Sequence, residues 1–183
     1  MPFLHDGNEM LRRTASWIVS QHPEWGEALA GYFAAQLKAL PSDDALAKQL
    51  AQLSGSPAIS ALLAESVRAG NVTALRAVAL ASPREAPKPW LDALAELLPI
   101  AKAEVMPEAV NSARSLPWPK GGHAALLQAL ITAGSDAGLP TQLRLDALAA
   151  ARSVPKVDDG LFAFLIANLM PDKPVLTRTS AAN

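Results

Sequence analysis

Proline and glycine divide this chain into segments of about a dozen residues. Inside each segment the apolar residues recur at spacings of three and four, the period of a helix with one buried face, rather than at two. In one segment, for example, Leu161, Leu165 and Leu169 share a side. The pattern predicts an all-α fold without strands. The helices are expected over residues 8–21, 24–39, 43–53, 57–69, 72–81, 89–98, 103–115, 121–133, 141–153, 159–169 and 175–182.

Composition allows a sizeable core and excludes several functions. Half of the 183 residues are apolar, enough to bury a sizeable core. The absence of cysteine excludes disulfides, thiolate metal ligands and covalent haem attachment. Sixteen Lys and Arg against seventeen Asp and Glu give a formal charge of -1, so there is no excess positive charge for a phosphate backbone. We therefore expect no nucleic-acid partner.

The sequence shows neither a signal-peptide pattern in its first residues nor a membrane-spanning apolar run. The first ten residues include Asp6 and Glu9 and lack the basic and apolar regions of a signal peptide. The longest apolar run, residues 161–167, is far shorter than the roughly 20 residues that cross a bilayer, so we expect no membrane insertion. Because helix-like patterns open and close the chain, we expect residues 1–183 to form a single repeat domain that is a fragment of a longer protein.

The most informative pattern is an internal repeat. The tetrad Leu-Arg-x-x-Ala begins at Leu11, Leu75 and Leu143, and residues 113–117 match residues 151–155 in type. With a diverged copy at Ala47, the anchor positions are Ala15, Ala47, Ala79, Ala109, Ala147 and Ala181. Each step holds two helices, and such a pair cannot bury both apolar faces alone, so successive pairs must stack. The spacing predicts an α-solenoid of about five to six antiparallel helix pairs. An irregular helical bundle in which the tetrad arises by chance is the alternative.

These residues resemble known helical repeats. The Arg-x-x-Ala helix, the second helix introduced by proline and the period in the low thirties are similar to HEAT and armadillo (ARM) repeats. Residues 11–18 with 22–26, and residues 161–165 with 171–174, resemble the helical-repeat region of planctomycete and verrucomicrobial membrane-bound dehydrogenase and cytochrome c multidomain proteins. The resemblance implies a bacterial redox protein and a periplasmic location. The haem motif and the propeller of that family are absent from this sequence, so their chemistry cannot be assigned to its residues.

The residues that commonly carry catalysis are scattered. His5, His22 and His123 fall in different repeats without a second ligand at helical spacing, so we expect no metal site and no cofactor. His22 is expected to bond carbonyls at a helix end, and residues 120–123 to form a flexible turn that lacks the frame of a phosphate loop.

Serine and aspartate patterns point to structure as well. No His is placed to serve Ser54, Ser56 or Ser60 as a base. The pairs at 43–44 and 158–159 open helices, where carboxylates cap free amides. We therefore expect no catalytic residues and no enzyme activity.

Arginines and tryptophans form the candidate interaction face. Arg12, Arg76, Arg144 and the looser Arg178 occupy equivalent places, where they either grip an anionic partner or bond to the neighbouring repeat. Trp90 after Pro89 and Trp118 between two prolines are expected to be partly exposed, as anchors of an interface or as plugs between helices. The candidate residues of the face are Arg12, Arg76, Arg144, Trp90 and Trp118.

The expected function is that of a non-catalytic protein-interaction or spacer module, a monomer that contacts a partner protein or a neighbouring domain of the same polypeptide. The alternative is a HEAT-like enzyme such as an alkyl-purine DNA glycosylase or a pigment lyase. A glycosylase needs a basic concave face with aromatic residues beside a carboxylate, and the near-neutral charge argues against one.

Overall fold

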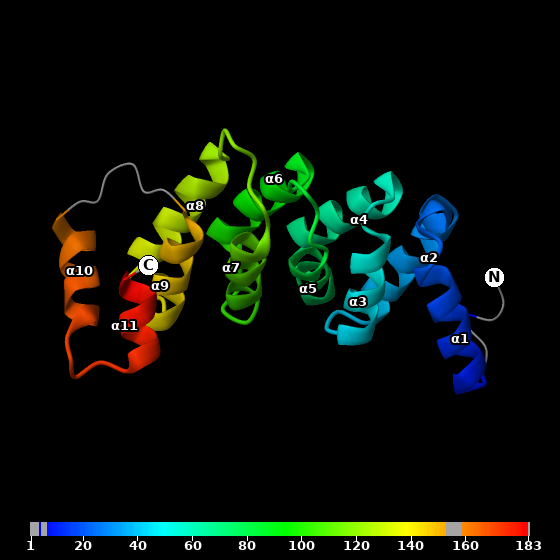
Figure 1. The fold of residues 1–183 in the computed structure, drawn as a ribbon, viewed down its shortest axis with the longest axis horizontal. Coiled ribbons are helices and arrows are strands. Elements are labelled where there is room, and N and C mark those ends of the chain that lie inside the picture. The colour runs from blue at the N-terminus through cyan, green and yellow to red at the C-terminus, as the bar shows by residue number, and fades with distance from the viewer. Residues whose placement is uncertain (1–3, 5–6, 153–158, 183) are drawn as a thin grey trace.

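The computed structural model describes residues 4, 7–152 and 159–182, and all regular structure in these ranges is helical (Figure 1). The predicted all-α class is confirmed. The helices are α1 (Glu9–Ser20), α2 (Gly26–Ala39), α3 (Asp44–Leu53), α4 (Pro57–Arg68), α5 (Val72–Leu80), α6 (Lys88–Leu97), α7 (Met106–Ser115), α8 (Ala124–Ser135), α9 (Thr141–Ala150), α10 (Asp159–Leu169) and α11 (Val175–Ala182), with short 3-10 turns η2 (Pro23–Trp25) and η3 (Leu98–Ile100).

The helices pack in two rows. The odd-numbered helices from α3 to α11 each pack on the next odd helix, and the even-numbered helices from α2 to α8 do the same. Figure 1 shows α1 and α2 at one end of an elongated molecule, with α10 and α11 at the other. The exception to the alternation is α10, which packs mainly on α11. Segments about thirty residues apart in sequence therefore lie side by side.

The buried side chains of the even row repeat. Leu29, Phe33 and Leu37 of α2 are buried at i, i+4 and i+8, the spacing of one helix face. Ile59, Leu63 and Val67 occupy the same places on α4, each thirty residues later. Consecutive even helices thus present the same face to the core.

The odd row follows the alignment made from sequence. Ala109 and Ala147 are fully buried, and so are Ala113 and Ala151, which follow them by four residues. Small side chains at these positions let α7 and α9 approach closely. Of the other anchor positions, Ala47 is buried, whereas Ala15, Ala79 and Ala181 are half-buried.

Local signals fix the helix starts. Asp43 Oδ1 accepts the Leu46 amide at 2.7 Å, which confirms the predicted carboxylate cap of α3. Asn71 caps α5 in the same way, and its Nδ2 donates to the Leu37 carbonyl at 2.8 Å, so this cap also ties two rows together. Ser56 makes no cap bond, and Pro57 at the first position starts α4.

The largest boundary errors, three residues each, are at the starts of α7 and α8 and at the end of α9. The expected start at residue 121 is wrong, since the helix begins at Ala124. Gly122 has a φ of +69°, a left-handed conformation that glycine adopts without strain and that ends the preceding turn. The expected end of α9 at residue 153 is also late, because Arg152 has a φ of +43° and lies outside the helix.

Candidate interaction surface along the loop edge

The arginine of α5 is held by carboxylates from both neighbouring odd helices. Arg76 Nε and Nη2 donate to Glu108 Oε1 on α7, and Nη1 donates to Asp44 Oδ1 on α3 at 2.8 Å. The Glu108 carboxylate, followed by Asp44, raises the pKa of the Arg76 guanidinium. Asp44 lies three residues before the anchor Ala47, so it occupies the position that arginine holds in the Leu-Arg-x-x-Ala tetrad. The charge of Arg76 is thus matched within the stack.

Arg144 is also directed at its neighbours. Its Nε donates to the Gly134 carbonyl at 2.9 Å, near the C-terminus of α8. The guanidinium carbon lies 3.7 Å from the centroid of the Phe164 ring on α10, a cation–π contact. Both contacts join α9 to other helices. The side chain of Arg12 lies outside the described part of the structure, so of the three candidate arginines only Arg76 and Arg144 can be placed. Their helices, α5 and α9, are separated by α7.

The two tryptophans of the expected face differ. Trp90 is 1% exposed and donates Nε1–H to the Ser60 carbonyl of α4 at 2.9 Å, so its expected partial exposure is wrong. The even row buries the first turn of α6 against α4, and a surface cannot include this ring. Trp118 is half-buried, as expected, and its Nε1–H donates to the Ala113 carbonyl at 3.0 Å.

The histidines act locally. His22 Nδ1 lies 2.7 Å from Glu24 Oε1, and its ring stacks on Trp25 with centroids 4.2 Å apart. The expected bond from His22 to helix carbonyls is therefore wrong. The hydrogen bond with His22 lowers the pKa of Glu24. His5 lies outside the described residues.

His123 is the N-cap of α8 and not part of a flexible turn. Its Nδ1 accepts the Leu126 amide at 3.2 Å, and its Nε2 lies 2.9 Å from Asp92 Oδ1. Asp92 also binds Lys88, and these two partners, Lys88 first, lower its pKa. Sequence reasoning missed this cap because the preferred N-cap residues have hydroxyl, amide or carboxylate side chains.

The remaining candidates for chemistry are engaged or exposed singly. Ser54 Oγ donates to the Ala51 carbonyl, and Asp159 is exposed in the first turn of α10. Asp158 lies outside the described residues. Within the described ranges no three His, Asp or Glu side chains cluster as metal ligands. The expectation of no metal and no cofactor stays a prediction.

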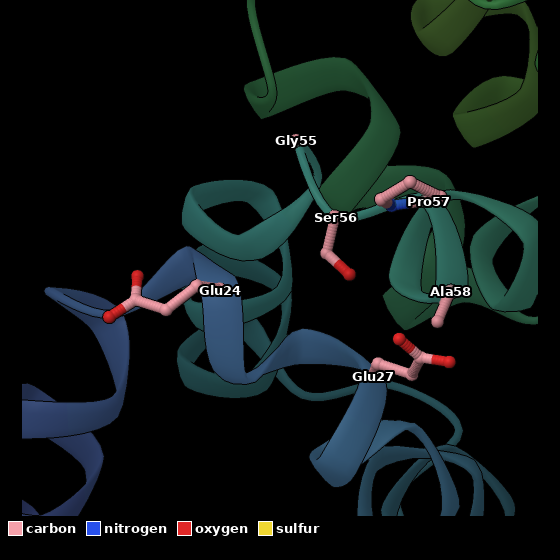
Figure 2. Close-up of a pocket in the computed structure, with 6 residues that line it drawn as sticks. All are labelled: Glu24, Glu27, Gly55, Ser56, Pro57 and Ala58. Carbon is pink, nitrogen blue, oxygen red and sulfur yellow. The ribbon is translucent and has the colours of Figure 1, made fainter.

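One edge of the molecule carries a series of hollows. We call it the loop edge and define it by the junctions from odd to even helices, residues 21–25, 54–56, 81–87, 116–123 and 151–152. The first hollow lies between the first two of these junctions (Figure 2). It is lined by Glu24, Glu27, Gly55, Ser56, Pro57 and Ala58.

The second hollow adjoins the first, because Gly55 and Pro57 line both. Its other lining residues are apolar or neutral and include Pro83, Pro87 and the buried Trp90. Ser54 and Ser60 add hydroxyl groups, and no charged side chain is among its lining residues.

The third hollow lies between the last two junctions. It is lined by Trp118, Pro119, Lys120, Gly121, Gly122, His123, Ala124, Leu127 and Arg152. Arg152 Nη2 donates to the Leu116 carbonyl at 2.7 Å and to the Arg114 carbonyl at 3.2 Å, which fixes the guanidinium on this wall. The volumes of the three hollows, about 510, 560 and 430 Å³, are each enough for one or two side chains of a ligand.

The expected interaction face did not include the loop edge. A signal for it exists in the sequence, since the junctions at 54–57, 82–89 and 116–122 are all rich in proline, glycine or serine. The junctions on the opposite edge, such as 40–43, 98–105 and 136–140, also contain proline, so this signal does not by itself separate the two edges. Only the two rows of helices show which junctions share an edge.

Two further findings bear on the function. Among the described residues, no helix combines the length and the apolar character that crossing a bilayer requires. Comparison of the chain with protein-family models, with curated proteins and with solved structures gives no significant match.

Proposed function

We propose that this chain is a non-catalytic protein-interaction module built from HEAT-like helix pairs, and that an extended segment of a partner protein docks on its loop edge. The observation that carries the proposal is a set of three hollows on one edge: two adjoining hollows that share Gly55 and Pro57, and a third between the last two odd-to-even junctions. Repeated hollows suit a ligand that is itself extended, because one side chain can enter each hollow in turn.

The two rows of helices support the HEAT-like interpretation. The odd helices and the even helices from α2 to α8 each pack on the next helix of their row, and the buried positions of α2 recur on α4 thirty residues on. Polar contacts follow the same period. Arg76 reaches Asp44 and Glu108, each thirty-two residues away, and Trp90 reaches Ser60 thirty residues away. Contacts between nearest neighbours are what stabilise a stack of repeats.

The use of the polar side chains favours interaction over catalysis. Asp43 and His123 cap helices, Arg76 links three helices, and His22 pairs with Glu24. The glycosylase alternative needs a carboxylate beside an aromatic residue on a basic wall. The third hollow has Trp118 with Lys120 and Arg152, but no carboxylate is among its lining residues.

The partner belongs to the same polypeptide or to another protein. The resemblance to dehydrogenase and cytochrome c multidomain proteins makes a neighbouring redox domain our first candidate for the source of the docked segment. The genomic reading frame around this segment tests that source directly, since a downstream Cys-x-x-Cys-His would supply the cytochrome domain.

The docking itself is tested by selecting a displayed library of unstructured peptides against the purified chain and measuring Kd for the winners. Gly55 lines the first two hollows, and a Cβ there meets nothing within 4 Å, so Gly55→Trp places a bulky side chain at the wall that the two hollows share. We expect at least tenfold weaker binding. The matched control is Gly31→Trp, which is equally open but lies on α2 away from the hollows. Equal Kd values for the two variants would contradict docking at the loop edge.

A further inference from the structure

The three hollows differ in charge along the edge, and this order points to the chemistry of the ligand. We infer that the docked segment is bipolar, with basic residues in the first hollow, apolar residues or proline in the second, and acidic residues in the third. The inference rests on the proposed function and adds the charge pattern and the orientation of the ligand.

The first hollow is acidic. Glu24 and Glu27 are its charged lining residues, and both side chains are exposed. Figure 2 shows the Glu27 carboxylate near the Ser56 hydroxyl, whereas the Glu24 side chain lies on the other side and its carboxylate points away from both. The bond to His22 holds Glu24 in place and lowers its pKa, so the carboxylate is ionised at neutral pH. The Glu27 carboxylate beside a hydroxyl, with the charge of Glu24 on the same hollow, suits a lysine or arginine.

The second hollow carries no charge among its lining residues and offers the rings of Pro83 and Pro87. Proline surfaces of this kind take apolar side chains or proline. Because Gly55 and Pro57 belong to both walls, a ligand passes from the first hollow to the second without leaving the surface.

The third hollow is basic. Lys120 and Arg152 give it two positive charges, while His123 is already paired with Asp92. Trp118 and Leu127 add an apolar wall, so the site suits an acidic residue next to an apolar one. The edge is continuous up to this point, because the Ala86 amide donates to the Pro117 carbonyl at 2.8 Å and joins the neighbouring junctions.

The spacing of the hollows sets the length of the ligand. Packed helices lie about 10 Å apart, and the first and third hollows are three even-helix steps apart, so the span is about 30 Å. An extended chain rises about 3.3 Å per residue, and about nine residues therefore cover it. A peptide of about twelve residues with one charge cluster at each end is long enough to reach both charged hollows.

The test uses four such synthetic peptides with the same apolar centre: one bipolar, one acidic at both ends, one basic at both ends and one neutral. We expect the bipolar peptide to bind at least tenfold more tightly than the other three, and less tightly as salt rises. A spin label on its acidic end should broaden the amide signals of Gly121 and Gly122. A label on its basic end should broaden those of Glu27 and Gly55.

Charge reversal supplies the variant. Lys120→Glu should weaken binding of the bipolar peptide about tenfold, whereas Lys102→Glu, an exposed lysine on the opposite edge, should not. Equal affinity for all four peptides, or labels that act in the reverse order, would overturn the inference while leaving docking itself intact. Failure of every peptide, together with an empty library selection, would overturn the proposed function instead.

Discussion

Arg76 on α5 donates two hydrogen bonds to a single carboxylate oxygen of Glu108 on α7, at 2.9 and 2.7 Å. The same guanidinium reaches Asp44 on α3, so one side chain joins three consecutive odd helices. The sequence places arginine at this position of the repeat but leaves two roles open, docking an acidic partner or bracing the stack. The contacts of Arg76 are those of a brace.

Reversing two arginines distinguishes these roles. In the double variant Arg76→Glu, Arg144→Glu, the new carboxylate at position 76 faces Asp44 and Glu108. At position 144 the contacts with the Gly134 carbonyl and the Phe164 ring are lost. We expect a clear loss of free energy of unfolding in urea, about 1–3 kcal/mol for the two sites together. The folded fraction should still bind the selected peptide with the wild-type Kd. Unchanged stability with weaker, salt-dependent binding would show instead that these arginines form a docking face.

The cap of α8 gives a second prediction. Because His123 Nδ1 accepts the Leu126 amide, the ring proton is on Nε2, where it is donated to Asp92. Nitrogen NMR shifts of the ring should show the Nε2–H tautomer at neutral pH. His123→Ala should lower the free energy of unfolding by about 1 kcal/mol or more, and His123→Asn, which keeps a capping side chain, by less. Equal losses would mean that the Asp92 contact alone matters.

Two glycines in helices should respond in opposite directions to the same substitution. A Cβ on Gly134 of α8 would run into the Leu148 side chain of α9, whereas a Cβ on Gly31 of α2 meets nothing within 4 Å. Gly31→Ala should raise the free energy of unfolding by about 0.5–1 kcal/mol through helix propensity. Gly134→Ala should lower it by about 1–3 kcal/mol through overpacking. Thermal and urea unfolding measure both, and a gain at position 134 would refute the close α8–α9 contact.

Acid stability should depend on Asp92. Its pKa is lowered by hydrogen bonds from Lys88 and His123, so its contribution is fully present above the ordinary Asp pKa, about 3.9, and is lost as pH falls through the folded-state value. Asp92→Asn should therefore unfold with a flatter pH dependence below about pH 4 than the wild type. Asp172→Asn, on the exposed turn before α11, is the control. Parallel curves for Asp92→Asn and the wild type would contradict the prediction.

The sequence by itself determined the helices. All eleven predicted segments start within three residues of the observed helices, and the largest differences are at α7 and α8. Caps such as Asp43, prolines such as Pro57 and the spacing of apolar residues act within one helix, so a local pattern contains the necessary information. The match of Ala109 with Ala147 extended this to the packing of α7 and α9, because close helix contacts require small residues at the crossing.

Only the tertiary structure decided what each side chain does across the repeats. When the sequence is considered alone, exposure is compatible with both Trp90 at a helix start and Arg76 on a helix face. In the structure Trp90 is buried and donates to the Ser60 carbonyl, and Arg76 is bound by Glu108. Those partners lie about thirty residues away, and nothing in the local sequence specifies them. The loop edge is likewise a product of stacking, since it exists only where residues of successive junctions, such as Gly55 and Pro83, line one hollow. Helix formation depends on neighbours along the chain, whereas burial and binding surfaces depend on neighbours in space.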